Sequence, residues 1–383
     1  MARSQNTRDD HVTQIEDLVS SARALDRGPT KIAILEEAVR IADSHHDTDR
    51  GFALRLELID VANFGGRQDV GVVAFAWCLA AVDREPERFD GKRILWMYKW
   101  MITASAKYPQ FPRSRLGAML ADMGRRYAEA GAGMHPVHQT ARELYRILGD
   151  LPAATAAHER AMRCSEDPLS NCRACEQDSL VAIYLDTDRT DLALRAAEPI
   201  VGGRMTCAVV PHCTYPFLLL PLVLRGQAEL AAVYHRKGLK LIGTKPQFVS
   251  EAAHHIFFLA FTGNLVAAAK LFSKNLLNAA SATCPVDQFD FARTGMFLFD
   301  VLADAEESAT ATDRKKVPRV RFPTSYLLPD GVSSTDPAAL RDHFGDKARE
   351  LARAFDARNG NDWYTRRLDE LADLKARITP HTI

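Results

Sequence analysis

The segment NCRACEQD, residues 171–178, separates Cys172 and Cys175 by two residues, in a chain that has seven cysteines. Two thiolates at this spacing, where a turn enters a helix, can supply two ligands to one metal ion. A helix N-terminus also favours the thiolate over the thiol. The same pair could instead form a redox couple, or be two reduced, half-buried residues. The sequence therefore raises three readings of this pair.

Further ligands for a metal ion lie downstream of this pair. A structural Zn²⁺ takes four Cys or His ligands. We predict a structural Zn²⁺ held by Cys172, Cys175 and Cys207, with His212 or Cys213 as the fourth ligand. Four protein ligands would leave no open position for catalysis. The reduced-cysteine reading stays open beside this one, and a thioredoxin-type couple would need a strand followed by a helix, which the sequence does not show.

The elements that must position these thiols are helices. In the segment TKIAILEEAVRIA, Ile32, Leu35, Val39 and Ala42 recur on one helical face. The same spacing continues along almost the whole chain, whereas strand-like alternation is nearly absent. The pattern predicts an all-α fold.

Tight turns recur at a regular interval. The turns near Gly149, Asp188, Gly226 and Gly263 are 37 to 39 residues apart, and a helix that opens with alanines follows each one. Small residues let two helices approach closely, and a pair of helices can bury its apolar faces only by stacking on neighbours. The pattern resembles tetratricopeptide repeats and predicts a tetratricopeptide-like (TPR-like) α-solenoid of stacked antiparallel helical hairpins.

The hairpin prediction also places the thiols. One helix is expected over about residues 175–186 and its partner over about 191–201. In an antiparallel pair, the end of the second helix returns to the level of the start of the first. The loop that carries Cys207 should therefore lie at the same edge as Cys172 and Cys175.

Four stretches carry a closer resemblance: LSNCRACEQD, AEPIVGGRMTC, FTGN and FDARNG. They are similar to segments that occur in the same order in an actinobacterial group of tetratricopeptide-like proteins, and the likeness covers roughly residues 140–360. That group has no assigned reaction. The resemblance implies the fold and draws attention to the cysteines, and it implies no activity.

The chain divides into three parts by composition. Residues 1–305 carry the solenoid pattern, and residues 306–335, rich in proline and polar residues, are predicted to be a linker or a strap. Residues 336–383 are predicted to form a C-terminal helical hairpin that caps the solenoid. Asp336 followed by Pro337 is typical of a helix start, with a capping residue and then proline at the first helical position.

Aromatic and histidine residues outside the cysteine segments are candidates for a partner or ligand groove. Trp96 and Trp100 share one helix face, and Tyr108 follows them; ordinary core packing is the alternative reading. Adjacent residues on a helix point about 100° apart, so His254 and His255 cannot easily chelate one ion. One of the two histidines can face a groove while the other packs against a neighbour.

Composition excludes several classes of function. Lys+Arg and Asp+Glu both total 49, so the zero net charge removes the basic surface of a general nucleic-acid binder. The N-terminal residues lack the apolar segment of a signal peptide, and the longest apolar run, YPFLLLPLVL, is about half the length that crosses a bilayer. We expect a cytoplasmic protein that is not in the membrane and has reduced cysteines.

The motifs of common enzyme classes are missing from the sequence. It contains no phosphate-binding loop, no dinucleotide-binding glycine motif and no nucleophile elbow, so we predict no enzymatic activity. We predict an interaction scaffold whose concave surface binds a peptide or a helix of a partner protein. The alternative is a ligand-sensing regulatory subunit that acts through a partner, and a metal-dependent enzyme ranks third.

Overall fold

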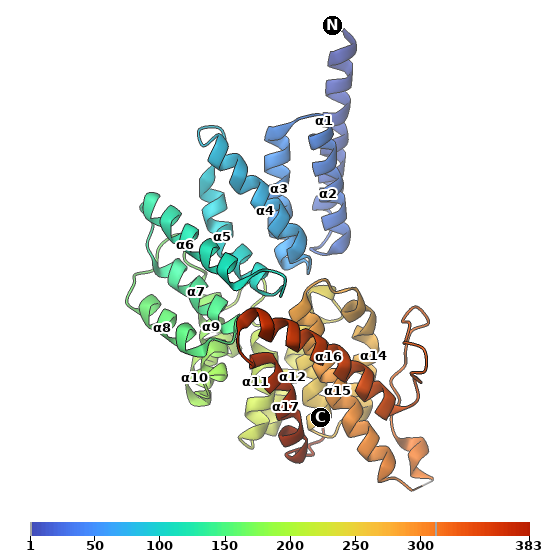
Figure 1. Ribbon diagram of the computed structural model, residues 1–383. Coiled ribbons are helices and arrows are strands. Elements are labelled where there is room, and N and C mark those ends of the chain that lie inside the picture. Colours follow the sequence, from blue (N-terminus) through green and yellow to red (C-terminus); the bar gives the residue numbers. More distant parts are fainter. Residues whose placement is uncertain (1, 311) are drawn as a thin grey trace. The chain divides into compact units, whose positions relative to one another are not determined.

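All regular structure in the described part of the chain is helical. The computed structural model describes residues 2–310 and 312–383, with side chains from residue 10 onward. Seventeen α-helices and two short 3₁₀ helices occupy these ranges, without a strand, and successive helices pack in neighbouring pairs (Figure 1). This confirms the predicted all-α, solenoid-like class, while the TPR-like assignment within that class stays a prediction. In the described residues, no helix is both long enough and apolar enough to cross a bilayer.

The first of two compact units runs up to Ala141 and also includes Arg160–Leu169. From α1 to α6, each helix packs against its neighbour along the chain. Its core is apolar and includes Leu35, Ile59 and Cys78, which are fully buried. The helices are α1 (Ala2–Arg23), α2 (Pro29–Ser44), α3 (Thr48–Phe64), α4 (Gln68–Arg84), α5 (Gly91–Ala106) and α6 (Arg113–Glu129).

The second compact unit comprises Arg142–Glu159 and Ser170–Ile383. Two helices, α7 (His135–Ile147) and α8 (Leu151–Met162), contribute residues to both units. The others belong to the second unit alone: α9 (Arg173–Asp186), α10 (Thr190–Val201), α11 (Thr214–Leu224), α12 (Ala228–Ile242), α13 (Val249–Phe261), α14 (Leu265–Ser281), α15 (Pro285–Glu307), α16 (Pro337–Asn359) and α17 (Trp363–Ala376). The 3₁₀ helices are η1 (Pro246–Phe248) and η2 (Asp313–Lys316).

The recurring turns have a common backbone conformation. Gly149, Gly226 and Gly263 have φ angles of 69°, 75° and 74°, and Asp188 has a φ of 55°. This left-handed conformation ends a helix by satisfying its last carbonyl groups, and glycine adopts it without a steric penalty. Aspartate is one of the few other residues that tolerate it. The interval of 37 to 39 residues between these turns therefore separates the ends of every second helix, from α7 to α13.

The C-terminal segment begins its first helix where the sequence predicts. The Asp336 side chain accepts hydrogen bonds from the backbone N–H groups of Ala338 and Ala339, with Pro337 at the first helical position of α16. The helix stops at Gly360, which has a φ of 72°. These contacts confirm the predicted helix start, because the cap satisfies two N–H groups that the helix itself leaves unpaired.

An aromatic cluster joins this hairpin to the rest of the second unit. The ring of Phe272 on α14 lies 4.5 Å from Phe291 and 5.4 Å from Phe299, both on α15. It also lies 5.2 Å from Phe344 on α16. All four side chains are buried, so α16 shares one apolar core with α14 and α15.

The segment between α15 and α16 lies against the same core. Val320 is buried, and Phe322 stacks on Phe299 with ring centroids 6.5 Å apart. Leu327, by contrast, is 87 % exposed. The segment contributes apolar side chains at intervals and is otherwise a surface strap.

Two histidines form a buried pair in the second unit. Nδ1 of His235 on α12 lies 3.0 Å from Nδ1 of His255 on α13, and both rings are buried. Burial lowers the pKa of His235 to about 4, with Arg236 adding to the shift, and burial lowers the pKa of His255 well below its usual value. The pair is therefore neutral at pH 7, with one ring donating to the other.

This pair predicts an acid-sensitive second unit. Below pH 6.5 the unfolded chain binds a proton at each histidine that the folded chain does not bind, so stability falls as the pH falls. Between pH 7 and 4.5, His235 alone should reduce the free energy of unfolding by about 2–3 kcal/mol. Denaturant unfolding at both pH values measures the loss.

A double variant, His235→Gln with His255→Gln, should remove this part of the pH dependence. The matched control is His46→Asn in the first unit, because His46 is exposed and asparagine tolerates its φ of 54°. An unchanged pH slope in the double variant would contradict the assignment.

Candidate metal centre

Three sulfur atoms of the second unit meet at one edge of the α9–α10 helix pair. Cys172 is the N-cap residue of α9, Cys175 lies in its first turn, and Cys207 lies in the loop between α10 and α11. All three Sγ atoms lie within 4.8 Å of one another, and those of Cys175 and Cys207 are 3.3 Å apart. The expected return of this loop to the C-x-x-C pair is confirmed.

A small core holds this loop in place. Ala174, Ile200 and Val210 are buried together, and the side chains of Cys175 and Cys207 pack against them. Three buried residues remove little apolar area from water. A bond between the start of α9 and the loop would therefore add substantially to the stability that the loop gains from apolar contacts.

The spacing of the sulfur atoms suits a metal ion. Zinc binds thiolate sulfur at about 2.3 Å, which puts two sulfurs of a tetrahedron about 3.8 Å apart. The observed separations, from 3.3 Å for Cys175 and Cys207 up to the 4.8 Å limit, bracket that value. A disulfide needs about 2.05 Å between its sulfurs, and none of the seven cysteines, all of which lie in the described part of the chain, forms one. Three soft donors at this spacing can hold Zn²⁺ or another thiophilic ion.

The protonation of the pair also favours a cation. The Cys175 thiol donates to the Cys207 sulfur, and this bond, together with the backbone N–H groups of Val209 and Val210, lowers the pKa of Cys207. The same interaction raises the pKa of Cys175. An incoming ion would displace the protons of the thiols that bind it.

His212 and Cys213 lie outside the group of three sulfurs. The His212 ring stacks on Phe248 with centroids 5.3 Å apart, and the Cys213 thiol donates to the Glu251 carboxylate at 3.2 Å. Among the described residues, no fourth Cys, His, Asp or Glu completes the group within 4.8 Å. The position of Cys213 depends on α11. Cys213 is the N-cap residue of that helix, and α11 packs on α13, which carries Glu251. The described residues bring three candidate ligands together here.

The aromatic groove candidates of the first unit pack against one another. Trp96 and Trp100 meet edge to face at 6.2 Å, and Trp100 meets Phe64 in the same way at 5.1 Å. The Lys99 ammonium lies 3.5 Å from the centre of the Trp96 ring, and Tyr108 is buried. These contacts are typical of a core boundary.

The two adjacent histidines of the second unit face different surroundings. His255 packs against His235 inside the core, whereas His254 lines a cavity of about 650 Å³. Arg293 lines the same cavity, and the sequence analysis does not single it out. The signal in the sequence is its position in FDFARTGMFLF, where a cation interrupts a run of buried phenylalanines.

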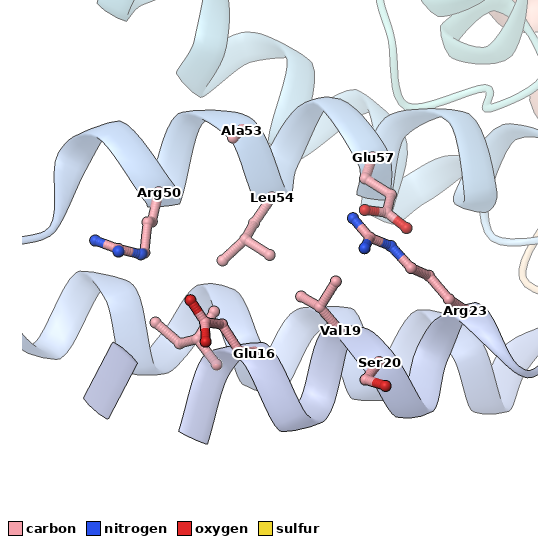
Figure 2. A pocket seen from close by; sticks show the side chains of 9 residues that line it. Glu16, Val19, Ser20, Arg23, Arg50, Ala53, Leu54 and Glu57 are labelled. Carbon is pink, nitrogen blue, oxygen red and sulfur yellow. The ribbon is translucent and has the colours of Figure 1, made fainter. Parts of the chain in front are cut away.

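A second hollow, of about 360 Å³, lies between α1 and α3 in the first unit (Figure 2). Val19 and Leu54 point into it from opposite helices, and Glu16, Arg23 and Glu57 are among its charged lining residues. Its lining contains no cysteine or histidine. It resembles a gap in helix packing, with charges of both signs at its edge.

Comparison with known proteins does not assign this site. No protein-family model matches the sequence, and no curated protein matches it either. The chemistry of the three thiols therefore rests on their geometry.

Proposed function

We propose that this protein is a helical scaffold whose second unit binds one structural Zn²⁺ through Cys172, Cys175 and Cys207. The observation that carries the proposal is the approach of these three sulfur atoms to within 4.8 Å of one another from two segments of the chain. Thiolate sulfur is the donor that Zn²⁺ takes most often in structural sites. Thiols of this kind stay reduced in the cytoplasm, the compartment that the sequence favours.

The role of the ion would be to fasten the α10–α11 loop to the start of α9. When metal binding requires the folded loop, the free energy of binding adds to the stability of the fold. The core of Ala174, Ile200 and Val210 is small, so the metal would add to the stability of the loop. Because His212 and Cys213 face other side chains, the fourth ligand of a tetrahedral ion would come from solvent or from a partner protein.

The interaction role rests on the architecture. Stacked helix pairs present an extended surface on which a peptide or a helix of a partner can bind. This part of the proposal is an argument from fold class, so it predicts the kind of partner and not its identity.

Elemental analysis of protein purified without chelator under reducing conditions tests the metal site. We expect one zinc per chain. Removal of the ion should increase hydrogen exchange in residues 202–213, because the loop then depends on its small core. Reconstitution with Mg²⁺ is the control, since a hard cation that prefers oxygen ligands should not bind. Protein that remains below about 0.2 zinc per chain after reconstitution would contradict the proposal.

A further inference from the structure

The largest hollow described in the second unit is the 650 Å³ cavity next to His254. Residues of α9, α11, α13, α15 and α17 contribute to its lining. Small-molecule sites typically occupy about 300–1,000 Å³. The cavity is therefore large enough for a compact organic ligand.

The lining of the cavity has an apolar side and a polar side. The apolar side comes mainly from α11 and its neighbours: Leu185, Pro216, Phe217, Leu220, Pro221 and Leu224. The polar side comes from α13, α15 and α17, with His254, Asp290, Arg293 and Arg367. A ligand that fits both sides has an apolar body and a polar head.

Two carboxylates of the lining, Asp290 on the polar side and Asp186 at the end of α9, already have partners. Asp290 accepts from an Arg367 N–H group at 2.8 Å and from the Ser250 hydroxyl at 2.6 Å. Asp186 accepts from Arg146 at 3.1 Å. These ion pairs occupy both carboxylates, and neither Asp290 nor Asp186 forms an ion pair with Arg293.

Arg293 is the half-buried arginine of the lining for which the described residues provide no ion pair, whereas Arg377, which also has none, is exposed to solvent. Its Nε–H donates to the backbone oxygen of Arg367 at 2.7 Å, and its guanidinium lies 5.1 Å from the centre of the Phe257 ring. Among the described residues, no Asp or Glu forms an ion pair with it, although the charges of Asp290 and of Glu370 at the exposed rim offset part of its own charge. Burial, and then the charge of Arg367, lower the pKa of Arg293 to about 10. Arg293 is half-buried, and a cation that is partly removed from water without a paired anion is costly.

His254 adds a hydrogen-bond acceptor on the same wall. Its Nδ1–H donates to the Ser250 carbonyl oxygen at 2.8 Å, and burial lowers its pKa, so the ring is neutral at pH 7. The Nε2 atom of this tautomer accepts a hydrogen bond. A ligand hydroxyl or N–H group can therefore bind beside the site of its anionic group.

From this arrangement we infer that the cavity binds a small organic monocarboxylate, with its carboxylate on Arg293 and its apolar body against α11. A guanidinium matches a carboxylate with two parallel hydrogen bonds. The half-buried guanidinium of Arg293 balances one negative charge. The exposed rim carries three carboxylates, Asp188, Glu370 and Asp373, against the one exposed cation without an ion pair among the described residues, Arg377, so the rim would repel a dianion such as a phosphate monoester. The inference does not depend on the metal site, because none of the three cysteines lines the cavity.

Three naphthalene probes with the same apolar body test the inference: 2-naphthoate, 2-naphthalenemethanol and 2-naphthyl phosphate. Calorimetric titration of the full chain should show 2-naphthoate binding at one site, more tightly than the other two. Arg293→Met should weaken 2-naphthoate by about 10–100-fold and change the neutral alcohol by less than about twofold. Circular dichroism and thermal unfolding check that the variant is folded.

Two further variants keep the test decisive if Arg293→Met does not fold. Glu370→Gln, at an exposed position, should tighten 2-naphthoate by about two- to fivefold because it removes repulsion at the rim. Leu220→Trp should block all three probes by filling the apolar side. The inference is overturned if 2-naphthoate does not bind below about 1 mM, if the phosphate or the alcohol binds more tightly, or if these substitutions leave its affinity unchanged.

Discussion

Cys207→Ser is expected to lower the affinity of the second unit for Zn²⁺ by more than about 100-fold. Changes to groups that merely orient a ligand already cost about 10–100-fold in metal affinity, so the loss of one of three sulfurs should cost more. Of the three candidate ligands in the described part of the chain, Cys207 is the one outside the C-x-x-C segment, so its loss should release the loop from α9. Competition with a chromogenic chelator under reducing conditions measures the affinity.

Cys213→Ser is the matched control, because it removes a thiol from the end of the same loop. Its sulfur donates to Glu251 and lies outside the group of three, so the affinity should stay within about threefold of the original chain. Equal losses in the two variants would show that Cys213 is a ligand. Full retention of zinc in Cys207→Ser would remove the three-sulfur site altogether.

The sequence predicts the three-sulfur group because the group follows from helix periodicity. Turn positions such as Gly149 and Asp188 mark helix ends through their left-handed backbone, and an antiparallel pair then returns the loop to its starting edge. The positions of Cys172 and Cys207 therefore depend on secondary structure and connectivity alone. Both can be read from spacing.

The direction of a side chain within a loop does not follow from spacing. His212 and Cys213 lie at the start of α11, and their contacts with Phe248 and Glu251 depend on how that helix packs. A sequence shows which ligands are close along the chain, but it does not show which way a helix N-terminus turns them. The sequence therefore cannot decide whether His212 or Cys213 would be a fourth ligand.

The cavity could not be predicted from the sequence either, because it depends on how helices pack. Arg293 has no neighbour in the sequence that marks it as unpaired, because the carboxylate of Asp290 is taken by Arg367, which lies on α17. Likewise, the contact between His235 and His255 joins two helices whose facing residues are set by packing. Features that depend on which residue a distant helix supplies appear only in three dimensions.

Phe272→Ala is expected to destabilise the second unit by about 3–5 kcal/mol. The ring is fully buried and contacts aromatic rings on both α15 and α16, so its removal loses apolar burial and leaves a cavity lined by side chains of three helices. Native-state hydrogen exchange in α14, α15 and α16 measures the loss. Leu327→Ala is the control, because that leucine is 87 % exposed and its loss should change stability by less than about 0.5 kcal/mol.

The same variant tests whether the C-terminal hairpin is energetically separate from the helices before it. Since Phe272 on α14 and Phe344 on α16 belong to one cluster, Phe272→Ala should lower the protection of α16 as much as that of α14. Phe344→Ala, which removes the ring on the other side of this contact, should also lower the protection of both α14 and α16. Loss of protection confined to α14 would mean that residues 336–383 fold independently. Equal loss would mean that α17, which lines the cavity beside Arg293, is held in place by the core of the whole second unit.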